Sequence, residues 1–263
     1  MKILLGQEGV NPGRPDIDGR ASLWYAAQKH EGVVKILLER EEVDPNEPDI
    51  WGQTPLSDAV RNGHEGVVKI LLRREEVNPD KPDIDGRAPL SFASEYGYGR
   101  AVKILLGREE VNPDEPDNRG RTPLWFATLH GHEGVVEMLL GRGEVNPNKL
   151  DNDGRAPLSN AAMEGHEGVV KILLGGQEVN PDKPDNDGRT PLSFAAMEGH
   201  EGVVKMLLGW EEVNPNKPDN DGQTPLSIAT KQGQTPLLPF LKNRVERVVA
   251  LLQSRKVVTP STI

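Results

Sequence analysis

Five histidines could act as metal ligands or proton carriers, and all of them occupy one recurring position. They are His30, His64, His132, His166 and His200, each at the same turn of a repeated sequence unit. Because at least one whole unit separates each histidine from the next, their imidazoles cannot converge on one ion or one substrate. We therefore predict a structural role for them, with no metal site and no catalytic residue.

Carboxylates repeat in the same way, as a ladder with one member per unit. The ladder comprises Asp49, Asp83, Asp117, Asp151, Asp185 and Asp219. The stretch that begins at Lys149 resembles a calcium loop, but its first ligand position is Lys149 and its twelfth is Asn160 in place of Glu. Arginines that follow the turn glycines can offset the acids locally. These carboxylates are predicted to shape turns on a solvated edge.

The sequence contains no glycine-rich phosphate loop, no Ser-His-Asp order and no metal-binding helix motif. It also contains no cysteine, which excludes disulfides and thiolate metal sites. We predict that the chain is not an enzyme and needs no cofactor.

The elements that carry these residues are set by a repeat. Its turn glycines are Gly19, Gly52, Gly86, Gly120, Gly154, Gly188 and Gly222. The first step is 33 residues and every later step is 34. A period of this size indicates a solenoid, in which each unit buries its apolar faces against its neighbours.

One unit, residues 188–221, predicts two helices and an extended segment. Thr190 is placed to cap a first helix that begins at Pro191 and ends at Gly199. A second helix follows, with an apolar stripe from Val203 to Leu208. The remaining residues are rich in Pro, Gly, Asn and Asp, which favours an extended finger with a tight turn.

These features resemble the ankyrin repeats, whose units carry a Thr-Pro-Leu first helix, a Gly-His turn and a Val-Asn finger that ends at Asp-x-x-Gly. The matching triplets begin at Thr54, Thr122, Thr190 and Thr224, and the Gly-His pairs begin at Gly63, Gly131, Gly165 and Gly199. The resemblance covers nearly the whole chain. It implies an all-α solenoid of stacked helix-turn-helix units with β-hairpin-like fingers.

Two features depart from the family pattern. Serine usually replaces the histidine that the family places after Thr-Pro-Leu, and the finger holds an extra proline-containing stretch such as residues 79–83. The finger is therefore expected to be long and stiff. Asn-Pro-rich fingers of this kind resemble those of fungal ankyrin arrays.

The pattern predicts four segments. Residues 1–18 match the end of a unit, which indicates a truncated array or a half-cap, and residues 19–233 form the array of seven repeats. Residues 234–256 are predicted to form a capping helix with Val245, Val248, Val249 and Leu252 on its apolar face, and residues 257–263 a frayed tail. The first repeat has Ala21-Ser22 in place of Thr-Pro and lacks the turn glycine before His30, so this end is expected to fray first.

Charge and hydropathy narrow the classes of partner. Lys and Arg total 31 against 41 Asp and Glu, a net charge of −10, which disfavours nucleic-acid binding. No apolar stretch is long enough to span a membrane, and the N-terminus lacks the organisation of a signal peptide. We expect a cytoplasmic monomer that binds neither membrane nor nucleic acid.

Residues that bind a partner are expected at the positions where the repeats differ. The positions that are the same in every repeat are required for stacking one repeat on the next. The resemblance places the variable surface on the fingertips and on the exposed side of the first helices, which line a concave groove. Fingertip candidates include Ile50, Trp51, Ile84, Asp85, Asn118 and Arg119. Aromatic and arginine side chains are typical of interface centres.

Repeats two to four are predicted to contact a protein partner through Trp51, Asp58, Phe92, Tyr96, Arg119, Trp125, Phe126, Leu129 and His130. For each residue, drift at a tolerant position remains an alternative, and for Trp125 so does a core-filling role. Trp24 and Tyr25 are expected to pack at the end of the array, and Trp210 to lie off the groove. The alternative to a binding module is an architectural spacer from a larger regulatory protein, or an engineered, near-consensus scaffold without a partner.

Overall fold

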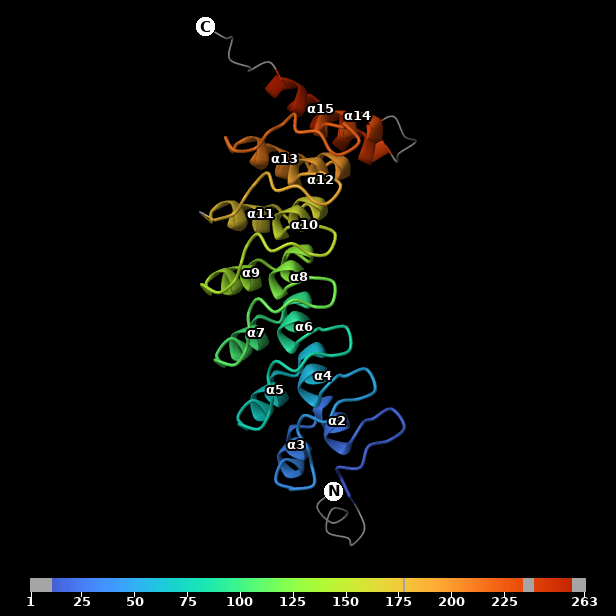
Figure 1. Cartoon of the computed structure of the whole chain (residues 1–263), viewed down its shortest axis with the longest axis vertical. Coiled ribbons are helices and arrows are strands. Elements are labelled where there is room, and N and C mark those ends of the chain that lie inside the picture. Colours follow the sequence, from blue (N-terminus) through green and yellow to red (C-terminus); the bar gives the residue numbers. More distant parts are fainter. Residues whose placement is uncertain (1–10, 177, 234–238, 257–263) are drawn as a thin grey trace. The chain divides into compact units, whose positions relative to one another are not determined.

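The structure is a computed structural model that describes residues 11–176, 178–233 and 239–256. The chain divides into two compact units, residues 1–123 and residues 124–263. In the described ranges every regular element is a helix (Figure 1), which confirms the predicted all-α repeat fold.

The first unit stacks three helix pairs. Its first helices are α2 (Ser22–Ala27), α4 (Pro55–Arg61) and α6 (Pro89–Glu95), and its second helices are α3 (Glu31–Leu37), α5 (Glu65–Leu71) and α7 (Gly99–Leu105). Each helix packs against its pair and against the equivalent helix of the neighbouring repeat, as α4 does with α2, α5 and α6. Figure 1 shows the fingers of this unit as loops between successive pairs.

The second unit continues the pattern and ends differently. Its first helices are α8 (Pro123–Leu129), α10 (Pro157–Glu164), α12 (Pro191–Glu198) and α14 (Pro225–Gly233). Its second helices are α9 (Glu133–Leu140), α11 (Glu167–Leu174) and α13 (Glu201–Leu208), followed by α15 (Pro239–Lys256). Helix α15 packs against α12, α13 and α14.

The signals that begin and end these helices are local. The Thr190 side chain accepts the Ser193 backbone N–H, Pro191 is the first residue of α12, and Gly199 ends the helix in the left-handed conformation at φ 72°. These three predictions are confirmed. By contrast, Ala21, Ala88 and Ala156 stand at the same capping position and supply no side-chain bond.

Each repeat contributes a small set of fully buried aliphatic side chains. Every first helix except α14 buries one leucine at 1% exposure or less, namely Leu23, Leu56, Leu90, Leu124, Leu158 and Leu192. Second helices bury a valine and a leucine, such as Val204 and Leu207 in α13. No single helix could bury these residues alone, so stacking supplies the core.

The fingertip turn is built on its aspartate. In the second finger, Asp49 Oδ1 accepts the backbone N–H groups of Trp51 and Gln53 at 3.0 and 2.9 Å. Gly52 between them has φ 78°, and a Cβ there would lie 2.9 Å from the Ile84 backbone nitrogen of the next finger. Glycine is therefore required both for the turn and for the close approach of the next finger.

Backbone hydrogen bonds join neighbouring fingers. The N–H of Ile84 donates to the Trp51 carbonyl at 3.0 Å, and in the second unit the N–H of Asn220 donates to the Asp187 carbonyl at 2.9 Å. The Asn-Pro stretch adds a second link, because Asn148 Oδ1 accepts the Asn180 N–H at 2.8 Å. The extra residues of the finger thus bond one repeat to the next.

Helix α15 buries Val245, Val248 and Leu252, while Val249 is partly exposed. Its Arg244 donates to the Gly199 carbonyl at 3.3 Å. The predictions for residues 1–10, 234–238 and 257–263 lie outside the described residues.

Candidate functional site

Two of the turn histidines contact backbone carbonyls of the preceding repeat. His166 Nε2 lies 3.0 Å from the Leu129 carbonyl, and His200 Nε2 lies 2.9 Å from that of Met163. Burial lowers the pKa of His200, and the charge of Arg244 acts in the same direction. Within the described part of the chain, no three histidine or acidic side chains are grouped so that they could hold a metal ion. These rings therefore link one helix pair to the next.

The aspartate ladder is used by the fingertip turns. Asp117 Oδ1 accepts two backbone N–H groups, and its Oδ2 accepts Arg121 Nε at 2.7 Å. Asp49, Asp151, Asp185 and Asp219 are buried in the same way. Both oxygens of Asp117 already accept hydrogen bonds from the protein. This carboxylate therefore stabilises the fingertip turn rather than binding a cation.

Four of the predicted contact residues are buried, which corrects the expectation that they face solvent. They are Asp58, Phe92, Trp125 and Phe126. Their burial leaves little of these side chains for contact with another protein.

Trp125 shows the physical reason. It is only 7% exposed, its indole Nε1 donates to Asp151 Oδ2 at 2.9 Å, and its ring meets Phe126 edge to face at 5.2 Å between centroids. The indole fills space beside the finger aspartate of the next repeat and satisfies its second oxygen. Trp125 is therefore a packing residue.

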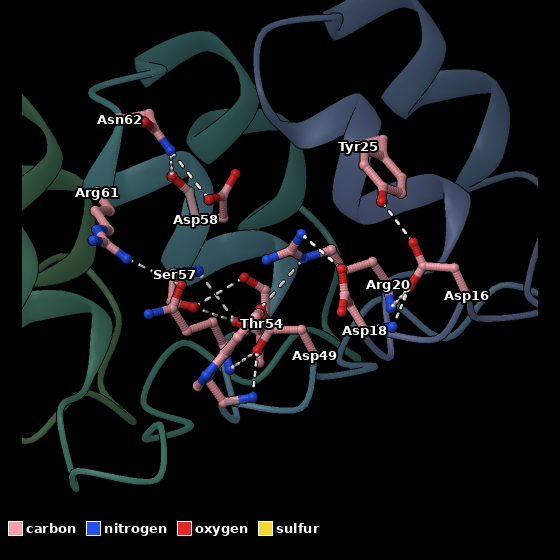
Figure 2. Close-up of polar contacts among 12 residues, drawn as sticks. Asp16, Asp18, Arg20, Tyr25, Asp49, Thr54, Ser57, Asp58, Arg61 and Asn62 are labelled. Atoms are coloured by element: carbon pink, nitrogen blue, oxygen red, sulfur yellow. Dashed lines mark hydrogen bonds and ion pairs between the residues drawn. The ribbon is translucent and has the colours of Figure 1, made fainter.

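Asp58 is buried with an incomplete set of partners. Its Oδ1 accepts Asn62 Nδ2 at 3.1 Å, as Figure 2 shows, whereas its Oδ2 has no hydrogen-bond partner. Burial raises the pKa of Asp58 to about 6, although Arg61 and Asn62 act in the opposite direction. The Asp58 carboxylate is thus withdrawn from solvent with one oxygen unpaired.

Trp51 and Tyr96 remain on the surface of the first unit, each 43% exposed. The Arg20 guanidinium lies 4.2 Å from the Trp24 ring centroid and 5.0 Å from that of Trp51. Arg20 is itself held between Asp18 and Asp49 (Figure 2), at 3.5 and 3.6 Å. Trp51 is thus supported on an ordered cation and keeps an exposed part for contact.

Tyr96 is ordered by a neighbouring ring. It stacks on Tyr98, with centroids 5.8 Å apart and an interplanar angle of 29°. Arg119 at the next fingertip is exposed. These residues give the first unit rigid aromatic groups with solvent access, which suits recognition of another protein.

The second unit places the last two predicted residues at the end of α8. Leu129 is half-buried and His130 is exposed. The His130 ring stacks on His132 with centroids 6.1 Å apart, and its Nδ1 lies 3.2 Å from the Phe126 carbonyl.

Elsewhere in this unit a cavity of about 300 Å³ lies beside α12 and α14. Ile228 lines it at a position where three other repeats carry a larger phenylalanine. Arg189, Asp219 and Lys231 give its wall mixed charge.

Sequence reasoning left out two exposed apolar side chains of the first unit. Tyr25 was expected to pack at the end of the array, but only Trp24 is buried, while Tyr25 is exposed and its hydroxyl donates to Asp16 Oδ2 at 2.6 Å. Ile17 is exposed at the first fingertip. Comparison of Ile17 with the asparagines at the same turn position in later repeats could have found it.

Comparison with protein families gives a single assignment. A family model described as ankyrin repeats in three copies matches residues 1–83, 74–151, 90–183, 140–218 and 158–248. A search of curated proteins finds no match. Among the described residues, no helix has both the length and the apolar character needed to cross a membrane.

Proposed function

The chain belongs to the ankyrin repeat family, and from this we propose that it binds a protein partner through the exposed fingertips and first helices of its first unit. Ankyrin repeats are generally protein–protein interaction modules, and proteins built from them are typically non-catalytic. What we propose for this chain is the surface that contacts the partner.

The observation that carries the proposal is the exposure of Trp51 and Tyr96 on ordered supports. Large aromatic side chains with restricted freedom lose little conformational entropy on binding and contribute much of the affinity at interface centres. Arg119 lies exposed in the same unit and adds a cation. Leu129 and His130 are proposed as a separate contact of the second unit.

Affinity capture tests the proposal, with the whole chain as bait and captured proteins identified by mass spectrometry. We expect a partner that is lost when Trp51→Ala and Tyr96→Ala are combined, because both side chains are exposed and their removal leaves the core intact. Trp125→Phe is the matched control. It removes a buried indole hydrogen bond, so it should lower stability by about 1–3 kcal/mol in urea unfolding and leave capture unchanged.

Two outcomes would contradict the proposal. If the parent chain captures no partner, the architectural spacer becomes the better description. If the double variant captures the same partner with the same yield, another surface is used. The expected monomeric state and cytoplasmic location stay predictions, to be checked by light scattering and by cell fractionation.

A further inference from the structure

The first three fingertips carry isoleucine where later fingertips carry asparagine. Ile17, Ile50 and Ile84 follow the turn aspartate directly, and we refer to them as the isoleucine column. Asn118, Asn152, Asn186 and Asn220 occupy the same position in the later repeats. The change is confined to the first unit.

The asparagines at this position bond the fingers together. Asn118 Nδ2 donates to the Ile84 carbonyl at 3.0 Å, and Asn220 Nδ2 donates to the Asn186 carbonyl at 2.9 Å. Isoleucine cannot make this bond. In the described residues, no backbone N–H of the chain donates to the carbonyls of Ile17 and Ile50 either.

The isoleucine column is also unusually exposed. Ile17, Ile50 and Ile84 are 96%, 56% and 61% exposed, and Trp51 lies directly after Ile50. At Ile50 and Ile84 the first unit therefore keeps the backbone bonds between fingers, lacks the side-chain bond, and exposes aliphatic side chains in a row. Neither change stabilises the fold, whereas both favour contact with another chain.

Two carboxylates border the isoleucine column, and among the described residues only one of them is paired. Asp18 follows Ile17 and is paired with Arg20 at 3.5 Å, whereas Asp85 follows Ile84. In the second unit the equivalent Asp187 lies 3.3 Å from Arg189, but in the first unit Arg87 is instead paired with Glu95. No ion pair involves Asp85 within the described part of the chain. With a net charge of −10 on the whole chain, complementarity favours a basic partner.

We propose that the isoleucine column is the docking strip for a short, extended protein segment that alternates apolar residues with Lys or Arg. This inference rests on the proposed function and specifies the class of partner. The apolar side chains of the segment cover the isoleucines and Trp51, while a cation of the segment meets Asp85. The segment is extended because a helix already uses its backbone N–H groups internally, whereas an extended chain offers them to the open carbonyls of Ile17 and Ile50.

The test pans a phage-displayed library of random short peptides against the whole chain and measures the affinity of synthetic versions of the enriched peptides. We expect enrichment of apolar residues interspersed with Lys or Arg. The triple variant Ile17→Asn, Ile50→Asn, Ile84→Asn should weaken binding at least about tenfold, because aliphatic contact is lost. Its melting temperature should stay equal or rise, because Asn at positions 50 and 84 can donate to the carbonyls of residues 17 and 50, so loss of binding will not reflect unfolding.

Two substitutions at equivalent turn positions test the role of charge, one as the variant and one as its matched control. Asp85→Asn should weaken binding several-fold and reduce its dependence on salt, whereas Asp187→Asn, at the same turn position but paired with arginine, should leave binding unchanged.

Three outcomes would overturn the inference. The first is enrichment of acidic or uncharged peptides. The second is binding that the triple variant preserves but the combined Trp51→Ala and Tyr96→Ala change abolishes, which leaves the proposed function standing. The third is failure to enrich any peptide while affinity capture still yields a folded partner, which again separates the two proposals.

Discussion

At the scale of single residues, one buried position shows how the repeats differ. The position six residues after each turn glycine varies from repeat to repeat. Its occupants, in chain order, are Tyr25, Asp58, Phe92, Phe126, Asn160, Phe194 and Ile228. Phe92, Phe126 and Phe194 bury a ring there, whereas Tyr25 is exposed. Asp58 and Asn160 place polar atoms there, and both polar atoms of the Asn160 side chain lack a hydrogen-bond partner. Burial of an unpaired polar group costs stability.

The cost at Asp58 depends on pH. Its pKa is about 6 in the folded chain, against about 3.9 for an unfolded aspartate. Because the folded pKa is the higher one, stability from the neutral form is fully present below about pH 4 and is lost as pH rises through 6. We expect Asp58→Asn to be more stable than the parent by about 2–3 kcal/mol at pH 7 and equal to it near pH 4, as measured by urea unfolding.

Asp85→Asn serves as the control for this prediction, because Asp85 is exposed and its substitution should shift stability little at either pH. Equal effects of Asp58→Asn at both values of pH would show that Asp58 titrates normally. Arg61, Arg20 and Asp49 are the charged groups that act on Asp58.

Sequence could not separate the exposed tryptophan from the buried one. Trp51 and Trp125 both replace polar residues at variable positions, so both were candidates for contact. The difference arises from the neighbouring finger, where Asp151 Oδ2 receives the Trp125 indole. Such a contact joins residues 26 apart and is set by stacking geometry rather than by local sequence.

At the scale of helices, the Glu-Gly pair that opens most second helices links consecutive repeats. The Glu133 carboxylate occupies the space that a Cβ at Gly168 would take, and Glu167 does the same at Gly202. A carboxylate at the start of the next helix is favourable because the N-terminus of a helix carries partial positive charge. Where Arg100 replaces the glycine, it pairs with Glu65 at 3.4 Å.

Two glycines at the same helix position allow a matched test. A Cβ at Gly134 would meet no atom within 4 Å, whereas one at Gly168 would overlap the Glu133 carboxylate. Gly134→Ala should stabilise the chain by about 0.5–1 kcal/mol through helix propensity. Gly168→Ala should gain less, because Glu133 must leave the helix N-terminus.

Urea unfolding of both variants measures this difference. In a Glu133→Gln background, Gly168→Ala should give the same increase in stability as Gly134→Ala. The reason is that residue 133 then carries no charge whose attraction to the helix N-terminus could be lost. Identical gains for the two single variants would argue that the Glu133 contact has no energetic value.

The helix boundaries were predictable because caps and prolines act within a few residues, as at Thr190 and Gly199. The role of the Asn-Pro stretch could not be predicted from the sequence. It was expected to stiffen the finger, and only the structure shows that Asn148 bonds Asn180 in the next repeat.

At the scale of the whole molecule, the described parts of the two units differ in how well their terminal helices are secured. In the second unit, Val248 of α15 is fully buried, and Arg247 lies 3.4 Å from Glu201. In the first unit, α2 has no side-chain cap, and Lys29 adopts φ 155° close to where the other repeats place a turn glycine. A non-glycine residue in that region is strained.

Hydrogen exchange should reveal this difference. We expect the backbone amides of α2 to exchange faster than those of α12, because local opening requires least free energy where caps and favourable backbone angles are missing. Mass spectrometry of peptides from both helices measures the rates. Uniform protection across the repeats would contradict this expectation.

The repeat number was evident from the glycine period, but the division into two units was not. The 34-residue step continues unchanged from Gly86 through Gly120 to Gly154, so no change in pattern marks residue 123. Only the distribution of contacts in three dimensions separates the two units.

The bonds between fingers also bear on how such an array changes length over generations. Excision of residues 154–187 would join Asp153 directly to Gly188 and restore a complete unit. Asn220 would then face the Asn152 carbonyl in place of that of Asn186, and His200 the Leu129 carbonyl in place of that of Met163. Unequal recombination between repeats of the second unit would therefore keep these two hydrogen bonds in shorter or longer chains, while the isoleucine column stays outside the exchanged segment.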